Sequence, residues 1–135
     1  MTSVYPVFAS DDMSYKKDFI SMLKNPNNVL PSTPEYEQDS LLFYSDNDIK
    51  NYLKEKIEKA DIIVILIGNN THSRKWVDYE IAVAKNLNIP IIGVRIPGSY
   101  GNLNFDLKFI AEWNVKDIQS NIGQALYYYD EDDEY

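Results

Sequence analysis

Residues 62–67 read Ile-Ile-Val-Ile-Leu-Ile, the longest uninterrupted apolar run in the chain. Five of these six side chains are branched at Cβ, which favours extended backbone over helix. A continuous run of this kind is typical of a central parallel strand that is covered by helices on both faces. Six residues are far too few to cross a bilayer. The run therefore predicts the middle strand of a parallel sheet.

The sequence on both sides of this run alternates between strand-like and helix-like patterns. The patterns predict strands at 4–9, 41–44, 62–67, 90–95 and 109–113, and helices at 14–24, 48–59, 74–87 and 116–128. Pro6 favours an edge position for the first strand. Ser10, Asp11 and Asp12 resemble an N-cap cluster for the helix that follows. This alternation predicts an α/β fold: one domain with an open, mostly parallel five-stranded sheet and helices on both faces, a three-layer sandwich.

Length and charge set limits on the domain organisation and on the partners. The chain has 135 residues, enough for one hydrophobic core, and a net charge of −8. Five acidic side chains fall in the last six residues, so we expect a domain over 1–128 and an acidic tail over 129–135 that is disordered or poorly anchored. An acidic chain gains no counterion-release energy on a phosphate backbone, which argues against nucleic-acid binding.

Residue types that are missing exclude several kinds of site. The chain has no cysteine, which excludes disulfides, thiol nucleophiles and cysteine-bound metals. It has one histidine, His72, so it cannot build a two-histidine metal site alone. The N-terminus lacks the pattern of a signal peptide, and no stretch is long enough to enter a membrane. We therefore expect a cytoplasmic protein with no membrane partner, no metal and no bound cofactor.

Parallel sheets bind ligands where their strands end at the carboxyl edge. Three loops are expected to converge there: 10–12, 68–73 and 95–104. The stretch 93–99 lacks the lysine of a phosphate loop, and no dinucleotide-binding glycine pattern is present. Asp11 and Asp12 are reminiscent of a phosphoryl-accepting regulator, but the central strand is followed by Gly68-Asn69-Asn70, with no aspartate to accept the group.

The helix expected over 74–87 contains a carboxylate in an unusual place. On a helical wheel Glu80 falls in the middle of an apolar arc formed by Trp76, Val77, Ile81, Val83, Ala84 and Leu87. A carboxylate there is costly unless it is paired or functional. Glu80 is therefore either a structural residue bonded to tyrosine, lysine or backbone N–H groups, or a functional residue that faces a cleft. Position alone leaves both interpretations open, and Trp76 one turn earlier belongs either to the core or to the wall of that cleft.

Three segments resemble the TIR domain family. Residues 7–12, Val-Phe-Ala-Ser-Asp-Asp, are similar to its first strand and loop, and 57–66 are similar to the segment that leads into its central strand. The most specific segment is 71–81, Thr-His-Ser-Arg-Lys-Trp-Val-Asp-Tyr-Glu-Ile, which resembles the T-H-S-x-W-x-x-x-E-I form of a bacterial TIR-like subfamily. That subfamily includes the TIR proteins of Thoeris anti-phage systems. The resemblance covers roughly 4–96; Ala9 stands where many TIR domains have isoleucine.

The resemblance implies an enzyme that consumes NAD⁺ as a substrate and needs no cofactor. It implies Glu80 as the catalytic residue, with Ser10 and Asp11 on the nucleotide side and His72, Ser73 and Trp76 near the nicotinamide ribose. It also implies self-association, a phage-derived trigger and an effector protein reached through a diffusible nucleotide, which is an ADP-ribose derivative and is expected to be cyclic. Many TIR domains are instead catalytically silent adaptors, and a nucleotide-binding or receiver-like regulator is a third alternative.

Overall fold

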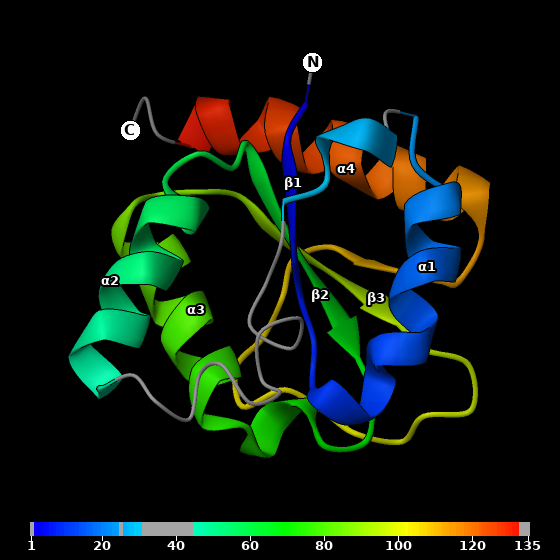
Figure 1. Ribbon diagram of the computed structural model, residues 1–135. Helices are drawn as coiled ribbons and strands as arrows, with labels where there is room; N and C mark the ends of the chain where they lie inside the picture. Colours follow the sequence, from blue (N-terminus) through cyan, green and yellow to red (C-terminus); the bar gives the residue numbers. More distant parts are fainter. Residues whose placement is uncertain (1, 25, 31–44, 133–135) are drawn as a thin grey trace.

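The structure is a computed structural model that describes residues 2–24, 26–30 and 45–132. Its described strands form one parallel sheet in the order β1 (Val4–Val7), β2 (Ile62–Ile67), β3 (Ile91–Arg95) and β4 (Ile110–Ala111). This confirms the expected parallel α/β architecture, with four described strands where five were expected. The fifth predicted strand, at 41–44, lies outside the described residues. Figure 1 shows β2 and β3 in the centre of the sheet.

The sheet is the middle of three layers. Helices α2 (Asp46–Ile57) and α3 (Lys75–Asn86) cover one face, and α1 (Met13–Ser21) and α4 (Val115–Asp132) cover the other (Figure 1). Alternate residues of β2 divide between the two cores: Ile63, Ile65 and Ile67 face α2 and α3, whereas Ile62, Val64 and Leu66 face α1 and α4. All six side chains are buried, as the central position of this strand requires.

Helices α1 and α2 begin differently: α2 has a side-chain cap, whereas α1 does not. Ser45 caps α2, because its hydroxyl accepts a hydrogen bond from the Asp48 amide at 3.2 Å. The N-cap residue of α1 is Asp12, a member of the predicted cluster, but the expected side-chain capping bond is absent. Residues Ser10–Asp12 form a separate 3₁₀ turn, and Asp12 makes no capping bond to α1. The Asp12 carboxylate lies against Gly68 in the second loop, and the Asp11 side chain bonds to that loop and to Arg74, so neither carboxylate caps α1.

The last helix extends further than expected. Its pattern predicted 116–128, but α4 continues to Asp132 and so includes the first part of the predicted acidic tail. The backbone of 130–132 is helical, while 133–135 lie outside the described residues, and the expectation of a disordered or poorly anchored tail stays a prediction. The division between a domain and a tail at 128 stays a prediction. Within the described part of the chain, no helix is both long and apolar enough to span a bilayer.

Helix α3 ends at a residue with left-handed backbone, Asn88. Asn88 lies just past the helix with a φ of 57°, in the left-handed region. The Asn88 amide donates to the Lys85 carbonyl at 3.2 Å and the Ile89 amide donates to the Ala84 carbonyl at 3.0 Å. These two bonds form a Schellman motif, which closes the helix and turns the chain toward β3.

We expect Asn88→Ala to lower the free energy of unfolding by about 1 kcal/mol, because alanine tolerates left-handed backbone less well than asparagine. Thermal and urea unfolding measure this change. Asn86→Ala is the matched control, because Asn86 is exposed and lies within the helix, where alanine is favoured. Equal effects of the two substitutions would contradict the role of Asn88 in the helix end.

Candidate functional site

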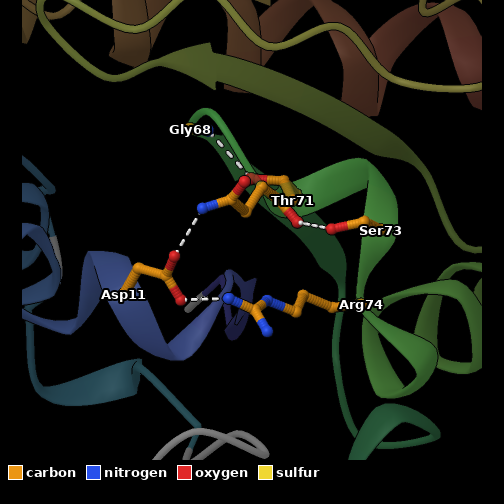
Figure 2. A network of polar contacts seen from close by, with 6 residues as sticks. Asp11, Gly68, Thr71, Ser73 and Arg74 are labelled. Carbon is orange, nitrogen blue, oxygen red and sulfur yellow. Dashed lines mark hydrogen bonds and ion pairs between the residues drawn. The ribbon is translucent and has the colours of Figure 1, made fainter.

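The three loops expected at the carboxyl edge do meet there. Asp11 joins the first loop to the second: its Oδ2 accepts from Asn70 Nδ2 at 2.6 Å, and its Oδ1 pairs with Arg74 Nη2 at 2.5 Å (Figure 2). The Asn70 hydrogen bond is the main reason that the pKa of Asp11 lies below its usual value, and the Arg74 charge acts in the same direction. Both partners of the ion pair are well exposed, so its contribution is about 0–1 kcal/mol and mainly sets the loop geometry.

The second loop is held by its own polar groups. The Gly68 amide donates to Thr71 Oγ1 at 2.8 Å, and that hydroxyl donates to the Leu66 carbonyl at 3.2 Å. Ser73 Oγ donates to the Asn70 carbonyl at 2.9 Å. Thr71 is completely buried, so its hydroxyl satisfies backbone groups that water cannot reach. This internal bonding fixes the direction in which α3 leaves the edge of the sheet (Figure 2).

The third loop packs directly on the second. The Tyr100 amide donates to Asn69 Oδ1 at 2.6 Å, and Asn104 Nδ2 donates to the His72 carbonyl at 3.0 Å. A Cβ on Gly101 would lie 2.2 Å from the Gly68 carbonyl oxygen, which leaves room for glycine alone. These contacts confirm that loops 10–12, 68–73 and 95–104 converge.

Asp12 has an unfavourable environment in this cluster. Its carboxylate lies against Gly68, where a Cβ would approach Asp12 Oδ2 to 2.1 Å. That oxygen is buried and has no hydrogen-bond partner among the described residues. Burial raises the pKa of Asp12 above its usual value of 3.8, the neighbouring Asp11 charge raises it further, and Arg74 partly opposes this. Charged Asp12 therefore costs free energy in the folded state.

Glu80 lies in the middle of α3. It lies six residues after Arg74, about 9 Å further along the helix axis. Glu80 is completely buried, and among the described residues it is the one charged side chain in the buried class. Its Oε2 accepts a hydrogen bond from the hydroxyl of Tyr5, which is also completely buried on β1. The wheel argument for burial is confirmed for Val77, Ile81, Val83 and Ala84, whereas Leu87 at 37 % is exposed.

The other predicted site residues lie on three neighbouring segments: Ser10 follows β1, His72 and Ser73 precede α3, and Trp76 is in the first turn of α3. Ser10 and Ser73 are exposed, and His72 and Trp76 are half-buried. His72 Nδ1 is buried without a hydrogen-bond partner in the described part of the chain. Trp76 packs edge-to-face against Tyr79, with ring centroids 5.9 Å apart, and Lys75 Nζ lies 4.8 Å from its ring centroid. Contact of all six residues with one ligand stays a prediction.

Two hollows formed by described residues lie at the opposite edge of the sheet. One, of about 160 Å³, borders Thr2 and Val4 at the start of β1, and the other, of about 320 Å³, borders Pro90 and Ile91 at the start of β3. Neither is lined by a predicted site residue. Among the described residues no three His, Cys, Asp or Glu side chains gather as a metal-ligand set.

Sequence reasoning did not select Tyr5, Asn70 or Arg74 as parts of this arrangement. Asn70 and Arg74 flank the T-H-S motif in the loop expected at the carboxyl edge. A search of that loop for donors to the Asp11 carboxylate could have found both of them. Tyr5 had a weaker signal, a polar-tipped aromatic side chain in a strand otherwise suited to burial. Its pairing with Glu80 spans 75 residues, and only the packing of α3 on β1 reveals it.

We expect Asp12→Asn to stabilise the fold at pH 7 by about 1 kcal/mol, because the amide removes a charge from a buried, unpartnered position. The folded pKa is raised, so the cost exists above that pKa and disappears as the pH falls below the unfolded value near 3.8. The gain in melting temperature, a few degrees at pH 7, should vanish near pH 3.

Asp18→Asn on exposed α1 surface is the control and should change little at either pH. A gain for Asp12→Asn that persists at pH 3 would contradict the electrostatic explanation.

Residues 5–100, well over half of the chain, match the family described as Thoeris protein ThsB, TIR-like domain. Among curated proteins none matches the chain. The matched range runs from the second residue of β1 through β3 and includes loops 10–12 and 68–73, the first part of loop 95–104 and Glu80. It ends before β4 and α4. The parallel sheet flanked by helices on both faces is consistent with a TIR-like fold. The chain therefore belongs to the Thoeris ThsB TIR-like family, and it is a TIR protein of anti-phage defence.

Proposed function

We propose that this protein cleaves the bond between nicotinamide and ribose in NAD⁺, with Glu80 as the catalytic carboxylate. The released ADP-ribose unit becomes a nucleotide messenger, linear or cyclic, that activates a partner effector. One observation carries the proposal: a completely buried carboxylate on α3, held by Tyr5, in the motif through which the chain resembles NAD⁺-consuming TIR domains.

The reaction suits a single carboxylate. The C1′–N bond breaks with its electron pair going to the pyridinium nitrogen, so neutral nicotinamide leaves without a general acid. The sugar becomes oxocarbenium-like, as in glycoside hydrolysis. A carboxylate about 4 Å from this positive charge contributes roughly 4 kcal/mol at an effective dielectric constant near 20, or about 10³ in rate. Water or a hydroxyl of the nucleotide then captures the cation and loses a proton.

The loop cluster supplies the remaining roles in the proposal. Ser10 and Asp11 contact the nucleotide side, and His72, Ser73 and Trp76 surround the nicotinamide ribose. The Asp11–Arg74 ion pair and the internally bonded loop hold these groups at one edge of the sheet. Glu80 is fully covered in this structure, so substrate contact requires the side chains over it to shift on binding.

A second candidate function is a catalytically silent adaptor that acts by self-association. The complete burial of Glu80 and its bond to Tyr5 favour a structural role for the carboxylate, and a structural Glu80 is what this alternative expects. In that case Glu80 stabilises the packing of α3 on β1 and takes part in no reaction.

We expect Glu80→Gln to lower NAD⁺ turnover about a thousandfold or more and to leave the fold intact or slightly more stable. The amide keeps the shape and can still accept from Tyr5, but it removes the charge that stabilises the oxocarbenium-like state. Nicotinamide release and melting temperature are measured on one preparation, with Asp78→Asn on the exposed face of α3 as the control.

A structural Glu80 makes the opposite prediction. Stability would then fall by about 1–2 kcal/mol, because a charge-assisted hydrogen bond from Tyr5 is replaced by a weaker neutral one, and any residual turnover would follow the folded fraction. Folded Glu80→Gln with the turnover of the parent chain would overturn the catalytic assignment. Mass spectrometry of nucleotides from phage-challenged cells identifies the product, since a messenger should accumulate with the parent chain and not with Glu80→Gln.

A further inference from the structure

We propose that Tyr5 is a positioning residue: its phenolic hydroxyl orients the Glu80 carboxylate and keeps it ionised. The inference rests on the proposed function of Glu80 and adds a second residue to it. Tyr5 touches neither substrate nor reacting atoms in this proposal, and it acts only through Glu80.

The geometry places the two groups on rigid elements. Tyr5 is the second residue of β1 and pairs in register with Ile63 of β2, while Glu80 lies in the middle of α3. Both side chains are completely buried on the face of the sheet that α2 and α3 cover. The hydroxyl of Tyr5 donates to Oε2 of Glu80 across this layer. The strand therefore sets the position of the donor independently of the helix that carries the acceptor.

The bond restricts a side chain that otherwise has considerable freedom. A glutamate has three rotatable side-chain bonds, whereas a tyrosine ring packed in a core has little freedom left. Because the ring of Tyr5 is enclosed, its hydroxyl is a fixed point to which one carboxylate oxygen is tied. The remaining orientation of the carboxylate is thereby limited, which is the kind of preorganisation that catalysis at a single charge requires.

The bond also favours the charge that the reaction needs. Burial favours the neutral form of a carboxyl group, and a hydrogen bond donated to the group favours its ionised form. Oε2 of Glu80 accepts such a bond from the Tyr5 hydroxyl. Removal of the Tyr5 hydroxyl should therefore shift ionisation of Glu80 toward higher pH.

A neighbouring tyrosine provides the matched control. Tyr79 precedes Glu80 on α3, and its hydroxyl donates to the backbone carbonyl of Lys50 on α2 at 3.0 Å. Tyr79→Phe removes one hydroxyl from the same helix–helix region without removing the donor to Oε2. Tyr5→Phe removes that donor and keeps the ring in the core.

The direct test is the titration of the Glu80 carboxyl group in ¹³C-labelled full-length protein, with its signal assigned by loss in Glu80→Gln. Tyr5→Phe should raise the midpoint by about one to two pH units, and Tyr79→Phe should not move it. A midpoint in Tyr5→Phe equal to that of the parent chain would overturn the inference.

Kinetics provide the second readout. For nicotinamide release from NAD⁺, Tyr5→Phe should lower kcat about ten- to a hundredfold with little change in KM, and should move the acid limb of the rate profile by the same interval as the titration. If the parent chain releases no nicotinamide, the proposed function fails, and the titration still decides whether Tyr5 controls Glu80. If the parent chain is active and Tyr5→Phe has the same kcat and the same pH–rate profile, the inference about Tyr5 is overturned while the proposed function stands.

Loss of folding in Tyr5→Phe would not leave the question open. Site-specific 3-fluorotyrosine at position 5 keeps the shape and is a stronger donor, so the Glu80 midpoint should move to lower pH. An unchanged midpoint in this variant would overturn the inference as well.

Discussion

The architecture depends on the complete burial of β2. Each of its six side chains is removed from water, and each large aliphatic side chain contributes about 1.5–3 kcal/mol when buried. Such a strand is stable only if apolar layers cover both faces and neighbouring strands satisfy its backbone on both edges. The helix pairs α1–α4 and α2–α3 supply the layers, and β1 and β3 supply the hydrogen bonds.

The same constraint brings the polar chemistry to one edge. Since β1, β2 and β3 are parallel, the loops that follow them emerge side by side, and their backbone groups need partners at the surface of the core. Thr71 accepts from the Gly68 amide and Asn69 accepts from the Tyr100 amide, while the Asn70 side chain donates to the Asp11 side chain of the adjoining loop. The result is an interlocked edge in which Gly101 is packed against the Gly68 carbonyl and Asp12 is packed against Gly68 itself.

Among the described residues, Glu80 is the one charged side chain that is buried within an apolar layer. Glu80 lies where Val77, Ile81 and Ala84 form a buried surface, and the fold accommodates its carboxylate with a donor from the first strand. A buried carboxylate is retained at a stability cost unless it is well paired. Its position within the range that matches the Thoeris ThsB TIR-like family connects the packing of α3 on β1 with the proposed chemistry.

The sequence by itself determined the parallel α/β class, the bounds of β2, the convergence of three loops and the place of Glu80 in the apolar stripe of α3, because these follow from local periodicity and chain order. It did not determine the cap of α1, where the side chain of Asp11 bonds to Asn70 and Arg74 instead, nor the extension of α4 into the acidic end. Only the tertiary structure decided that Tyr5 is the partner of Glu80. Residues 75 positions apart meet through the packing of a helix on a strand, and no local pattern records which side chains that packing brings together.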